Sequence, residues 1–179
     1  MGQRPPRRLL PHRQLRPIRS MDFIWSPWRY DYLASGGKRP QSCVFCLGED
    51  RSHDAERLIV FRGAYNFIIV NLFPYTSGHV MIAPFEHLDN IASAKAEQLS
   101  EMMELSQRVT AALQKLYRPE GFNLGMNLGT AAGAGIREHF HLHVVPRWFG
   151  DANFMTITGE TRVLPEDLST THRRLSEVL

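Results

Sequence analysis

The sequence predicts a single α+β domain with a mostly antiparallel five-stranded sheet, one long helix and a shorter C-terminal helix. Three observations favour this fold class. The chain has 179 residues, enough for one domain with a buried core. Five short runs that lie between turn residues are expected as strands, and the first two of them are rich in β-branched and aromatic residues. One longer stretch has apolar residues at helical spacing.

The first three strands are expected before residue 84. Residues 57–62 and 65–71 are β-rich and are separated by Gly63-Ala64, which predicts a hairpin. Residues 74–78 (Pro-Tyr-Thr-Ser-Gly) are typical of a turn. We therefore expect the third strand over residues 79–83.

Residues 94–117 change to a helical pattern. Pro119 and Gly121 are expected to end this helix. The adjacent Met102 and Met103 are expected to fill the core. The apolar residues recur at three- and four-residue steps: Leu99, Met102, Met103, Leu105, Val109, Ala112, Leu113 and Leu116.

The remaining elements follow in order. We expect a fourth strand over residues 122–128, a loop over residues 129–138 and a fifth strand over residues 139–145. Pro165 is placed in the first turn of a C-terminal helix. The apolar side of that helix is outlined by Leu168, Leu175 and Leu179.

Residues 1–20 differ in composition from the rest of the chain. They hold six arginines, four prolines and no acidic residue. They lack the apolar core of about 7–15 residues that a secretory signal needs, and the prolines oppose the amphipathic helix of a transit peptide. We expect a disordered basic arm or an upstream-start artefact, with an anionic-surface-binding tail as the alternative, and a folded domain over residues 21–179.

The charge and hydropathy of residues 21–179 argue against two classes of partner. Beyond the arm, only 15 of the 21 basic residues remain beside all 18 acidic residues. A nucleic-acid-binding domain normally carries its basic patch on the fold itself. No apolar run approaches the length of about 18 residues that spans a membrane. We therefore expect neither a nucleic-acid partner nor a membrane partner.

The chain has two cysteines, Cys43 and Cys46. A disulfide between them would close too short a loop to stabilise the fold, so the pair indicates metal or redox chemistry in a reducing compartment, here expected to be the cytoplasm. The thioredoxin-like alternative needs a strand before the pair, whereas the glycine- and proline-containing residues 36–40 precede it.

The most informative stretch is residues 138–147 (Glu-His-Phe-His-Leu-His-Val-Val-Pro-Arg). Imidazole and apolar side chains alternate in it, and alternate residues of a strand point to opposite faces. Each buried imidazole needs a hydrogen-bond partner, so three on one face indicate a functional site. The histidines are His139, His141 and His143, and the apolar residues are Phe140, Leu142 and Val144.

A loop rich in small residues, Gly129-Thr-Ala-Ala-Gly-Ala-Gly-Ile136, precedes the histidines. Small residues let backbone N–H groups approach phosphate oxygens. A phosphate-binding loop followed by histidines suggests phosphoryl or nucleotidyl transfer, with the middle histidine, His141, as the nucleophile. The alternative is that all three histidines are metal ligands.

Two of these stretches resemble the signatures of the histidine-triad (HIT) nucleotide-binding proteins. One is His139-Phe-His141-Leu-His143-Val-Val, and the other is the segment from Asn71 to His79, Asn-Leu-Phe-Pro-Tyr-Thr-Ser-Gly-His. The segments Trp25-Ser-Pro-Trp28-Arg29 and 146–154 are similar to the branch typified by bacterial diadenosine-tetraphosphate phosphorylases.

The resemblance implies a HIT-like fold and a role for each matching residue. His141 matches the nucleophile that forms a nucleotidyl-histidine intermediate. His143 and His79 match histidines that flank the phosphates. The remaining matches are implied nucleotide-binding residues: Asn71 at the ribose hydroxyls, Asn127 and Gly129 beside the phosphate loop, and Gly133 and Gly135 within it. Capping of a turn or strand end is the alternative for Asn71 and Asn127.

Two departures concern the leaving group. Many members of the family carry Ser or Thr three residues before the first triad histidine, where this chain has Ile136. The loop before His139 also looks one residue longer than in the small hydrolases. Both departures fit the phosphorylase-like branch better.

Zinc-bearing members of the superfamily imply a metal site. By that resemblance, His87 and His139 would complete a structural Cys₂His₂ zinc site with Cys43 and Cys46, and no catalytic metal is required. The alternative is a pair of reduced thiols and a helix-start histidine. The other histidines, His12, His53 and His172, are expected at the surface.

The sequence therefore predicts an enzyme that cleaves dinucleoside polyphosphates, such as diadenosine tetraphosphate, by phosphorolysis or hydrolysis through His141. A nucleoside phosphoramidase and a non-catalytic nucleotide-binding sensor are the alternatives. The resemblance also implies a homodimer, to which Trp25, Trp28 and the C-terminal helix could contribute.

Overall fold

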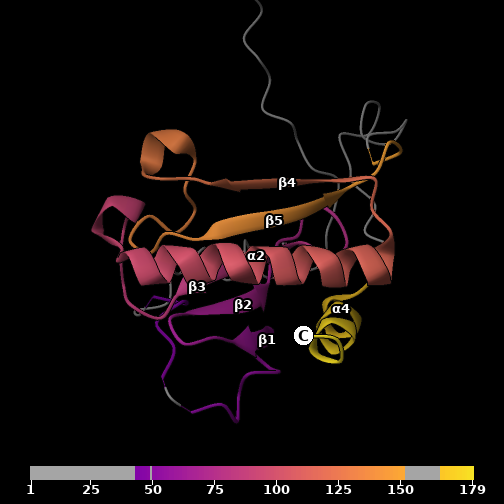
Figure 1. Ribbon diagram of the computed structural model, residues 1–179, viewed down its shortest axis with the longest axis horizontal. Helices are drawn as coiled ribbons and strands as arrows, with labels where there is room; N and C mark the ends of the chain where they lie inside the picture. Colours follow the sequence, from indigo (N-terminus) through magenta and orange to yellow (C-terminus); the bar gives the residue numbers. More distant parts are fainter. Residues whose placement is uncertain (1–42, 49, 152–165) are drawn as a thin grey trace, which may run out of the picture.

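The computed structural model describes residues 43–48, 50–151 and 166–179. They form a five-stranded antiparallel sheet in the order β1-β2-β3-β5-β4, with a long helix across one face and a short helix at one end (Figure 1). The predicted fold class is confirmed. The predicted boundary at residue 21, together with Trp25 and Trp28, lies outside the described residues.

The elements agree closely with their predicted positions. The helices are α2 (Ala96–Tyr117) and α4 (Leu168–Ser176), with the 3₁₀ turns η1 (Ile91–Ser93) and η2 (Thr130–Ala132). The strands are β1 (Ile59–Arg62), β2 (Asn66–Val70), β3 (Val80–Pro84), β4 (Gly121–Met126) and β5 (Leu142–Arg147).

Helix α2 supports the β1–β2 hairpin through one carboxylate. The Glu101 side chain accepts hydrogen bonds from the backbone N–H groups of Ala64, Tyr65 and Asn66 at 2.5, 2.8 and 2.7 Å. Ala64 and Tyr65 lie at the turn and Asn66 begins β2, so the carboxylate satisfies the backbone donors where the hairpin starts. The long helix thus holds the hairpin that the Gly63-Ala64 sequence predicts.

The same helix buries one side against the sheet. Met102, Leu105, Val109 and Leu113 are buried there. Met103 is 58% exposed, so the prediction that it fills the core is wrong. Consecutive residues of an α-helix point about 100° apart, and the narrow apolar side of α2 accepts only one of the two methionines.

The histidine stretch enters the sheet later than predicted. Hydrogen-bonded pairing begins at Leu142 rather than at residue 139. Before that point the Phe140 N–H donates to the Leu88 carbonyl at 2.7 Å, so this backbone pairs with a loop instead of with β4. The predicted alternation still holds, because Phe140, Leu142 and Val144 are buried in the core that α2 covers.

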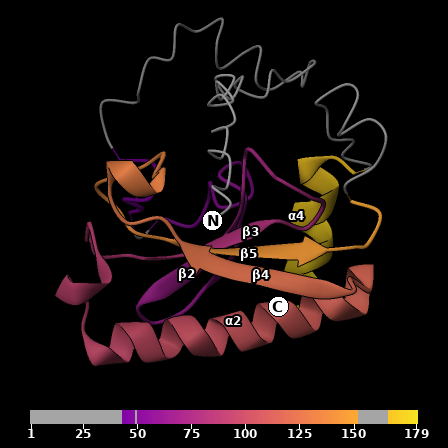
Figure 2. The same cartoon turned by 90° about the horizontal axis from the view of Figure 1, so that it is seen from above.

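A second, smaller core lies on the other face of the sheet. Figure 2 shows α2 along one side, with the turn before β5 and the indigo segment near residue 50 on the other. This second core is built from Phe45, Ile59, Phe67, Met81 and Ala83. The segment that carries the cysteines is thereby anchored on the face opposite α2.

Helix α4 closes one end of the sheet. The Asp167 side chain accepts a hydrogen bond from the Thr170 N–H at 2.8 Å and caps the helix. Pro165 lies outside the described residues. His172 is half-buried and donates from Nε2 to the Ile59 carbonyl at 2.9 Å, so its predicted surface position is wrong.

His53 is exposed, as predicted, whereas His12 lies outside the described residues. Among the helices of the described segments, none has the length and apolar character needed to cross a membrane.

Candidate active site

The triad histidines and His79 gather on the sheet face opposite α2. His143 lies in β5 and is paired with Met81 of β3, and His79 immediately precedes β3. The ring of His143 lies 4.9 Å from that of His141 and 5.2 Å from that of His79, centroid to centroid. The fold thus brings together two sequence motifs that are more than sixty residues apart.

His141 is held in one tautomer. Its Nδ1 lies 3.0 Å from the His139 carbonyl, which can only accept, so Nδ1 carries the hydrogen and Nε2 keeps a lone pair. The side chain is almost fully buried. Burial lowers the pKa of His141 and keeps the imidazole neutral, while the bond to the His139 carbonyl opposes this shift. A neutral imidazole with a free Nε2 is the form that can act as a nucleophile.

His79 and His143 form a second hydrogen-bonded pair. The Tyr75 backbone N–H donates to His79 Nδ1 at 3.0 Å, so the hydrogen of His79 sits on Nε2. That nitrogen lies 3.0 Å from His143 Nδ1 and donates to it. The hydrogen of His143 is therefore on Nε2, the ring nitrogen that His79 does not contact.

Burial keeps both rings of this pair neutral. It lowers the pKa of His79 to about 3, with further contributions from His143 and His141. Burial and the neighbouring His141 lower the pKa of His143 to about 4. Near neutral pH, both rings can therefore donate hydrogen bonds without carrying positive charge.

Asn71 lies beside this pair. Its Oδ1 accepts from the Phe73 N–H at 2.9 Å, as in an Asx turn, and its Nδ2 lies 3.3 Å from each ring nitrogen of His79. The capping alternative considered for Asn71 therefore describes one of its contacts. The amide also adjoins the histidine cluster, next to Leu72, which is 50% exposed.

The glycine-containing loop is an exposed turn between β4 and the histidines. Gly129 and Gly133 have φ angles of 80° and 85°, where a side chain would be strained. The Gly133 N–H donates to the Thr130 carbonyl at 3.0 Å and shapes η2. Gly135 is exposed and Asn127 is half-buried. Space is open above the glycines, since a Cβ added at any of the three would meet no atom within 4 Å.

A second cluster contains the four predicted metal ligands. The ligand atoms of Cys43, Cys46, His87 and His139 all lie within 4.8 Å of one another. Cys43 Sγ is 3.5 Å from His139 Nδ1, and Cys46 Sγ is 3.1 Å from His87 Nδ1 and 3.9 Å from His139 Nδ1. Tetrahedral bonds of about 2.3 Å to sulfur and 2.0 Å to nitrogen separate S and N by about 3.5 Å. The donor set therefore fits zinc.

The orientation of His139 supports the same fit. Its Nε2 donates to the Pro84 carbonyl at 2.8 Å, which leaves the Nδ1 lone pair facing the two sulfur atoms. A redox-active Cys-x-x-Cys pair usually has a lowered thiol pKa. Burial and the adjacent Cys43 instead raise the pKa of Cys46.

His139 and Phe45 connect the two clusters. The His139 ring belongs to the cysteine cluster, and its carbonyl fixes the tautomer of His141. Phe45, between the two cysteines, packs against the rings of His139 and His141 at 5.4 and 4.9 Å. Sequence reasoning assigns no role to Phe45, and its position inside Cys-x-x-Cys is the signal that could have indicated one.

Ile136, the departure from the usual Ser or Thr, is half-buried and packs against the second core that contains Phe45. This residue therefore has a packing role in the loop that leads to His139.

Residues 52–150 match the family model of the HIT domain. The chain belongs to the HIT family. The matched region includes the three triad histidines, His79 and His87 but not the two cysteines. The sequence-based identification of the family, and of the chain as an enzyme of that family, is confirmed.

Known HIT proteins resemble the chain over most of its length. It is 38% identical over 159 residues to a Mycobacterium tuberculosis protein named AP-4-A phosphorylase, covering 86% of this chain and 82% of that protein. A zinc-bound histidine triad family protein from Mycobacterium smegmatis superposes with a TM-score of 0.60 at 27% identity, covering 76% of this chain and 92% of that protein. A histidine triad nucleotide-binding protein from Sulfolobus tokodaii shares the fold, with a TM-score of 0.59 at 23% identity over 76% of this chain and 91% of that protein.

Proposed function

We propose that this chain cleaves dinucleoside polyphosphates such as diadenosine tetraphosphate by nucleotidyl transfer through His141. The observation that carries the proposal is the hydrogen bond from His141 Nδ1 to the His139 carbonyl, which leaves Nε2 with a lone pair. The relative named AP-4-A phosphorylase supports the substrate class. Fixing the tautomer in advance removes one source of disorder from the reacting geometry.

In the first step, His141 Nε2 attacks the α-phosphorus, and the bond from phosphorus to the bridging oxygen breaks. The leaving nucleotide keeps the bonding electron pair. Hydrogen-bond donors stabilise the charge that develops on phosphate, and His143 Nε2–H and the amides of loop residues 129–135 are the proposed donors. Asn71 is assigned to the ribose hydroxyls.

In the second step, an acceptor oxygen attacks the same phosphorus and returns the electron pair to His141 Nε2. We assign inorganic phosphate as the acceptor, in line with the phosphorylase name of the relative. Water as the acceptor would make the enzyme a hydrolase.

The test is incubation with diadenosine tetraphosphate, with and without inorganic phosphate, with the products separated by chromatography. ADP and ATP that form only with phosphate are expected. Formation of AMP and ATP without phosphate would show that the reaction is hydrolysis instead of phosphorolysis. Absence of any product would overturn the proposal in favour of the phosphoramidase or the nucleotide-binding sensor.

The cysteine cluster is proposed to hold a structural zinc ion. Cys43, Cys46, His87 and His139 would supply all four ligands, and four protein ligands leave no open position for a substrate. When bound, zinc would cross-link the cysteine segment to the histidine stretch. In the steps above, the roles of the protein are assigned to side chains and backbone groups, and the acceptor is inorganic phosphate.

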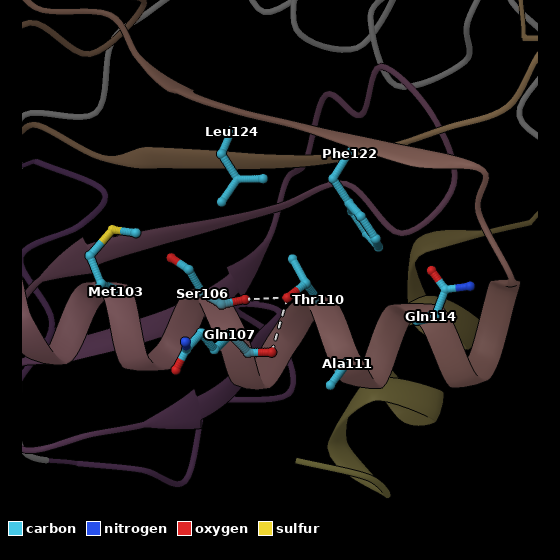
Figure 3. Close-up of a pocket in the computed structure, with 8 residues that line it drawn as sticks. All are labelled: Met103, Ser106, Gln107, Thr110, Ala111, Gln114, Phe122 and Leu124. Atoms are coloured by element: carbon cyan, nitrogen blue, oxygen red, sulfur yellow. Dashed lines mark hydrogen bonds between the residues drawn. The ribbon is translucent and has the colours of Figure 1, made fainter.

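A second copy of the chain is the proposed partner. Strand β4 is at the edge of the sheet, and an apolar groove of about 610 Å³ lies between it and α2 (Figure 3). Leu124 and Met103 line this groove and are 44% and 58% exposed. Pairing of β4 with its copy would satisfy the open edge and cover both side chains. The cytoplasmic location stays a prediction from the sequence.

A further inference from the structure

The hydrogen bonds between Tyr75, His79 and His143 form a chain with a fixed direction. The Tyr75 peptide N–H donates to His79 Nδ1, and His79 Nε2 donates to His143 Nδ1, each at 3.0 Å. A peptide N–H can only donate, so the direction of the whole chain follows from its first member. His143 consequently presents Nε2–H as the end of the chain.

The Tyr75 peptide N–H, which begins this series of hydrogen bonds, cannot supply a proton to His79. If His143 gave up its Nε2 proton, it could recover one at Nδ1 only by taking the proton of His79. His79 would then be an imidazolate, since its Nδ1 already accepts from the Tyr75 peptide N–H. The peptide N–H does not ionise near neutral pH. His143 can therefore share its hydrogen with an oxygen atom but cannot readily transfer it.

The hydrogen-bond partners of these histidines within the described residues are backbone groups, the Asn71 amide and one another. In residues 43–48, 50–151 and 166–179, no carboxylate hydrogen bonds to His79, His141 or His143. The Tyr75 ring stacks over the pair, 4.6 Å from the His79 ring and 6.1 Å from the His143 ring. Burial disfavours a positive charge on either imidazole, since it lowers the pKa of both.

We propose that His79 is a positioning residue that holds His143 as a neutral hydrogen-bond donor, and that the enzyme therefore accepts only leaving groups that depart as stable anions. This inference rests on the proposed nucleotidyl transfer at His141. A nucleoside polyphosphate leaves as an anion, because the second pKa of a phosphate monoester is about 6. Such a leaving group needs a hydrogen bond from His143 but does not need its proton.

The same series of hydrogen bonds excludes leaving groups that need a proton, because His143 cannot readily transfer one. An alkylamine must be protonated as its bond to phosphorus breaks, because its conjugate base is not formed in water and its ammonium pKa is about 10.4. An unsubstituted phenol has a pKa of about 10, so its need for a proton lies between that of a nucleoside polyphosphate and that of an alkylamine. The same logic applies to the acceptor, because inorganic phosphate attacks as an anion whereas water needs a base.

The first experiment compares AMP donors that differ only in the leaving group, with the full chain and inorganic phosphate. The donors are diadenosine tetraphosphate, the 4-nitrophenyl and phenyl esters of AMP, and an AMP alkylphosphoramidate. The first two should be consumed. The kcat/KM for the phenyl ester should fall at least about 100-fold below that of the nitrophenyl ester, and the phosphoramidate should fall further, since general acid catalysis contributes about 10²–10⁴-fold where it exists.

The outcomes separate this inference from the function it rests on. Turnover of the phosphoramidate within about tenfold of the nitrophenyl ester would overturn the inference and leave nucleotidyl transfer intact. Failure to consume any donor would overturn the proposed function, and the inference with it.

The second experiment reads the tautomers directly by ¹⁵N NMR of histidine-labelled protein. Both His79 and His143 should show the Nε2–H form at neutral pH. In His79→Gln, an amide N–H can still donate to His143 Nδ1, so His143 should keep that form and activity should be largely retained. His79→Leu has no donor, and His143 should become a mixture of tautomers. An Nδ1–H or doubly protonated His143 in the unaltered protein would overturn the proposal whether or not the variants fold.

Discussion

His139 makes three contacts that no neighbouring residue could replace together. Nδ1 faces the sulfur atoms of Cys43 and Cys46, Nε2 donates to the Pro84 carbonyl, and its own carbonyl accepts from His141. The ring thus serves the metal cluster while the backbone serves the candidate nucleophile. Replacing the His139 side chain should therefore act directly on the metal cluster, and on His141 only through a shift of the backbone, since any residue at this position keeps the carbonyl.

Replacing the nucleophile is the direct test at the residue scale. His141→Ala should lower kcat by at least about 10⁴-fold, in line with loss of a nucleophile in other covalent enzymes. Nucleotide binding should remain measurable by calorimetry. The matched control is His53→Ala, because His53 is exposed and its ring hydrogen bonds to Glu56 at the surface. Turnover retained in His141→Ala would contradict the assignment.

The buried histidines also predict how stability depends on pH. The pKa values of His79 and His143 are lowered to about 3 and about 4, so the unfolded chain, with histidine pKa near 6.5, binds more protons at intermediate pH. Their contribution to stability is complete above about pH 6.5 and is lost as the pH falls toward 4. The slope should be about 1 kcal/mol per pH unit for each histidine.

Urea unfolding between about pH 7 and pH 5 measures this slope. The double variant His79→Gln/His143→Gln should show a flatter dependence than the unaltered protein, whereas the other histidines titrate equally in both. An unchanged slope would mean that these two residues are protonated as easily in the folded chain as in the unfolded one.

At the scale of elements, the clearest feature is the contact between Glu101 of α2 and the β1–β2 hairpin. Glu101 accepts from three backbone N–H groups at the turn between β1 and β2. Glu101→Gln should lower the free energy of unfolding by about 1–3 kcal/mol, since hydrogen bonds to a charged group are lost. Denaturant unfolding measures the change, with Glu104→Gln as the control on the same helix, because Glu104 accepts a hydrogen bond from the nearby Ser100 hydroxyl and contacts no hairpin amide among the described residues. An equal effect of both variants would contradict a stabilising role for the contact between Glu101 and the hairpin.

The cysteine segment is the second element-scale feature. Cys43→Ser should lower both the zinc content and the Tm, because metal binding is coupled to folding. Activity should fall less than in His141→Ala, since zinc would act through the position of the histidine stretch. Metal analysis and thermal unfolding are the measurements. Zinc content equal to that of the unaltered protein would refute the site.

At the scale of the whole molecule, the open edge at β4 distinguishes the two sides of the sheet. The other edge strand, β1, is approached by α4, whereas β4, within the described part of the chain, pairs with β5 alone and adjoins the apolar groove. An exposed edge beside exposed apolar side chains favours association with another chain.

Leu124→Glu places a charge in the groove and should convert the proposed dimer to a monomer. Sedimentation velocity measures the change, and Asn123→Glu is the control on the same strand, because Asn123 does not line the groove. A species of unchanged mass in Leu124→Glu would contradict a dimer through this face. Monomeric unaltered protein would do the same.

Much of this arrangement follows from local sequence. Hydrophobic periodicity indicates α2 and the strands because it records which side of each element is buried. The spacing of two residues between the histidines puts their side chains on one face. The predictions for Met103 and His172 are wrong because residue spacing gives the direction of a side chain but does not show whether another element covers it.

Local periodicity is sufficient to predict the fold class, and motifs of fixed spacing are sufficient to recognise the family. The assignment of His87 and His139 as partners of the two cysteines follows from resemblance to zinc-bearing members of the superfamily. The tautomers depend on contacts that exist only in the folded chain. The Tyr75 N–H and the His139 carbonyl face specific ring nitrogens only after β3 and β5 pair, and backbone groups leave no mark in the sequence. The direction of each hydrogen bond, and with it the chemistry available to His141 and His143, is a property of the folded chain.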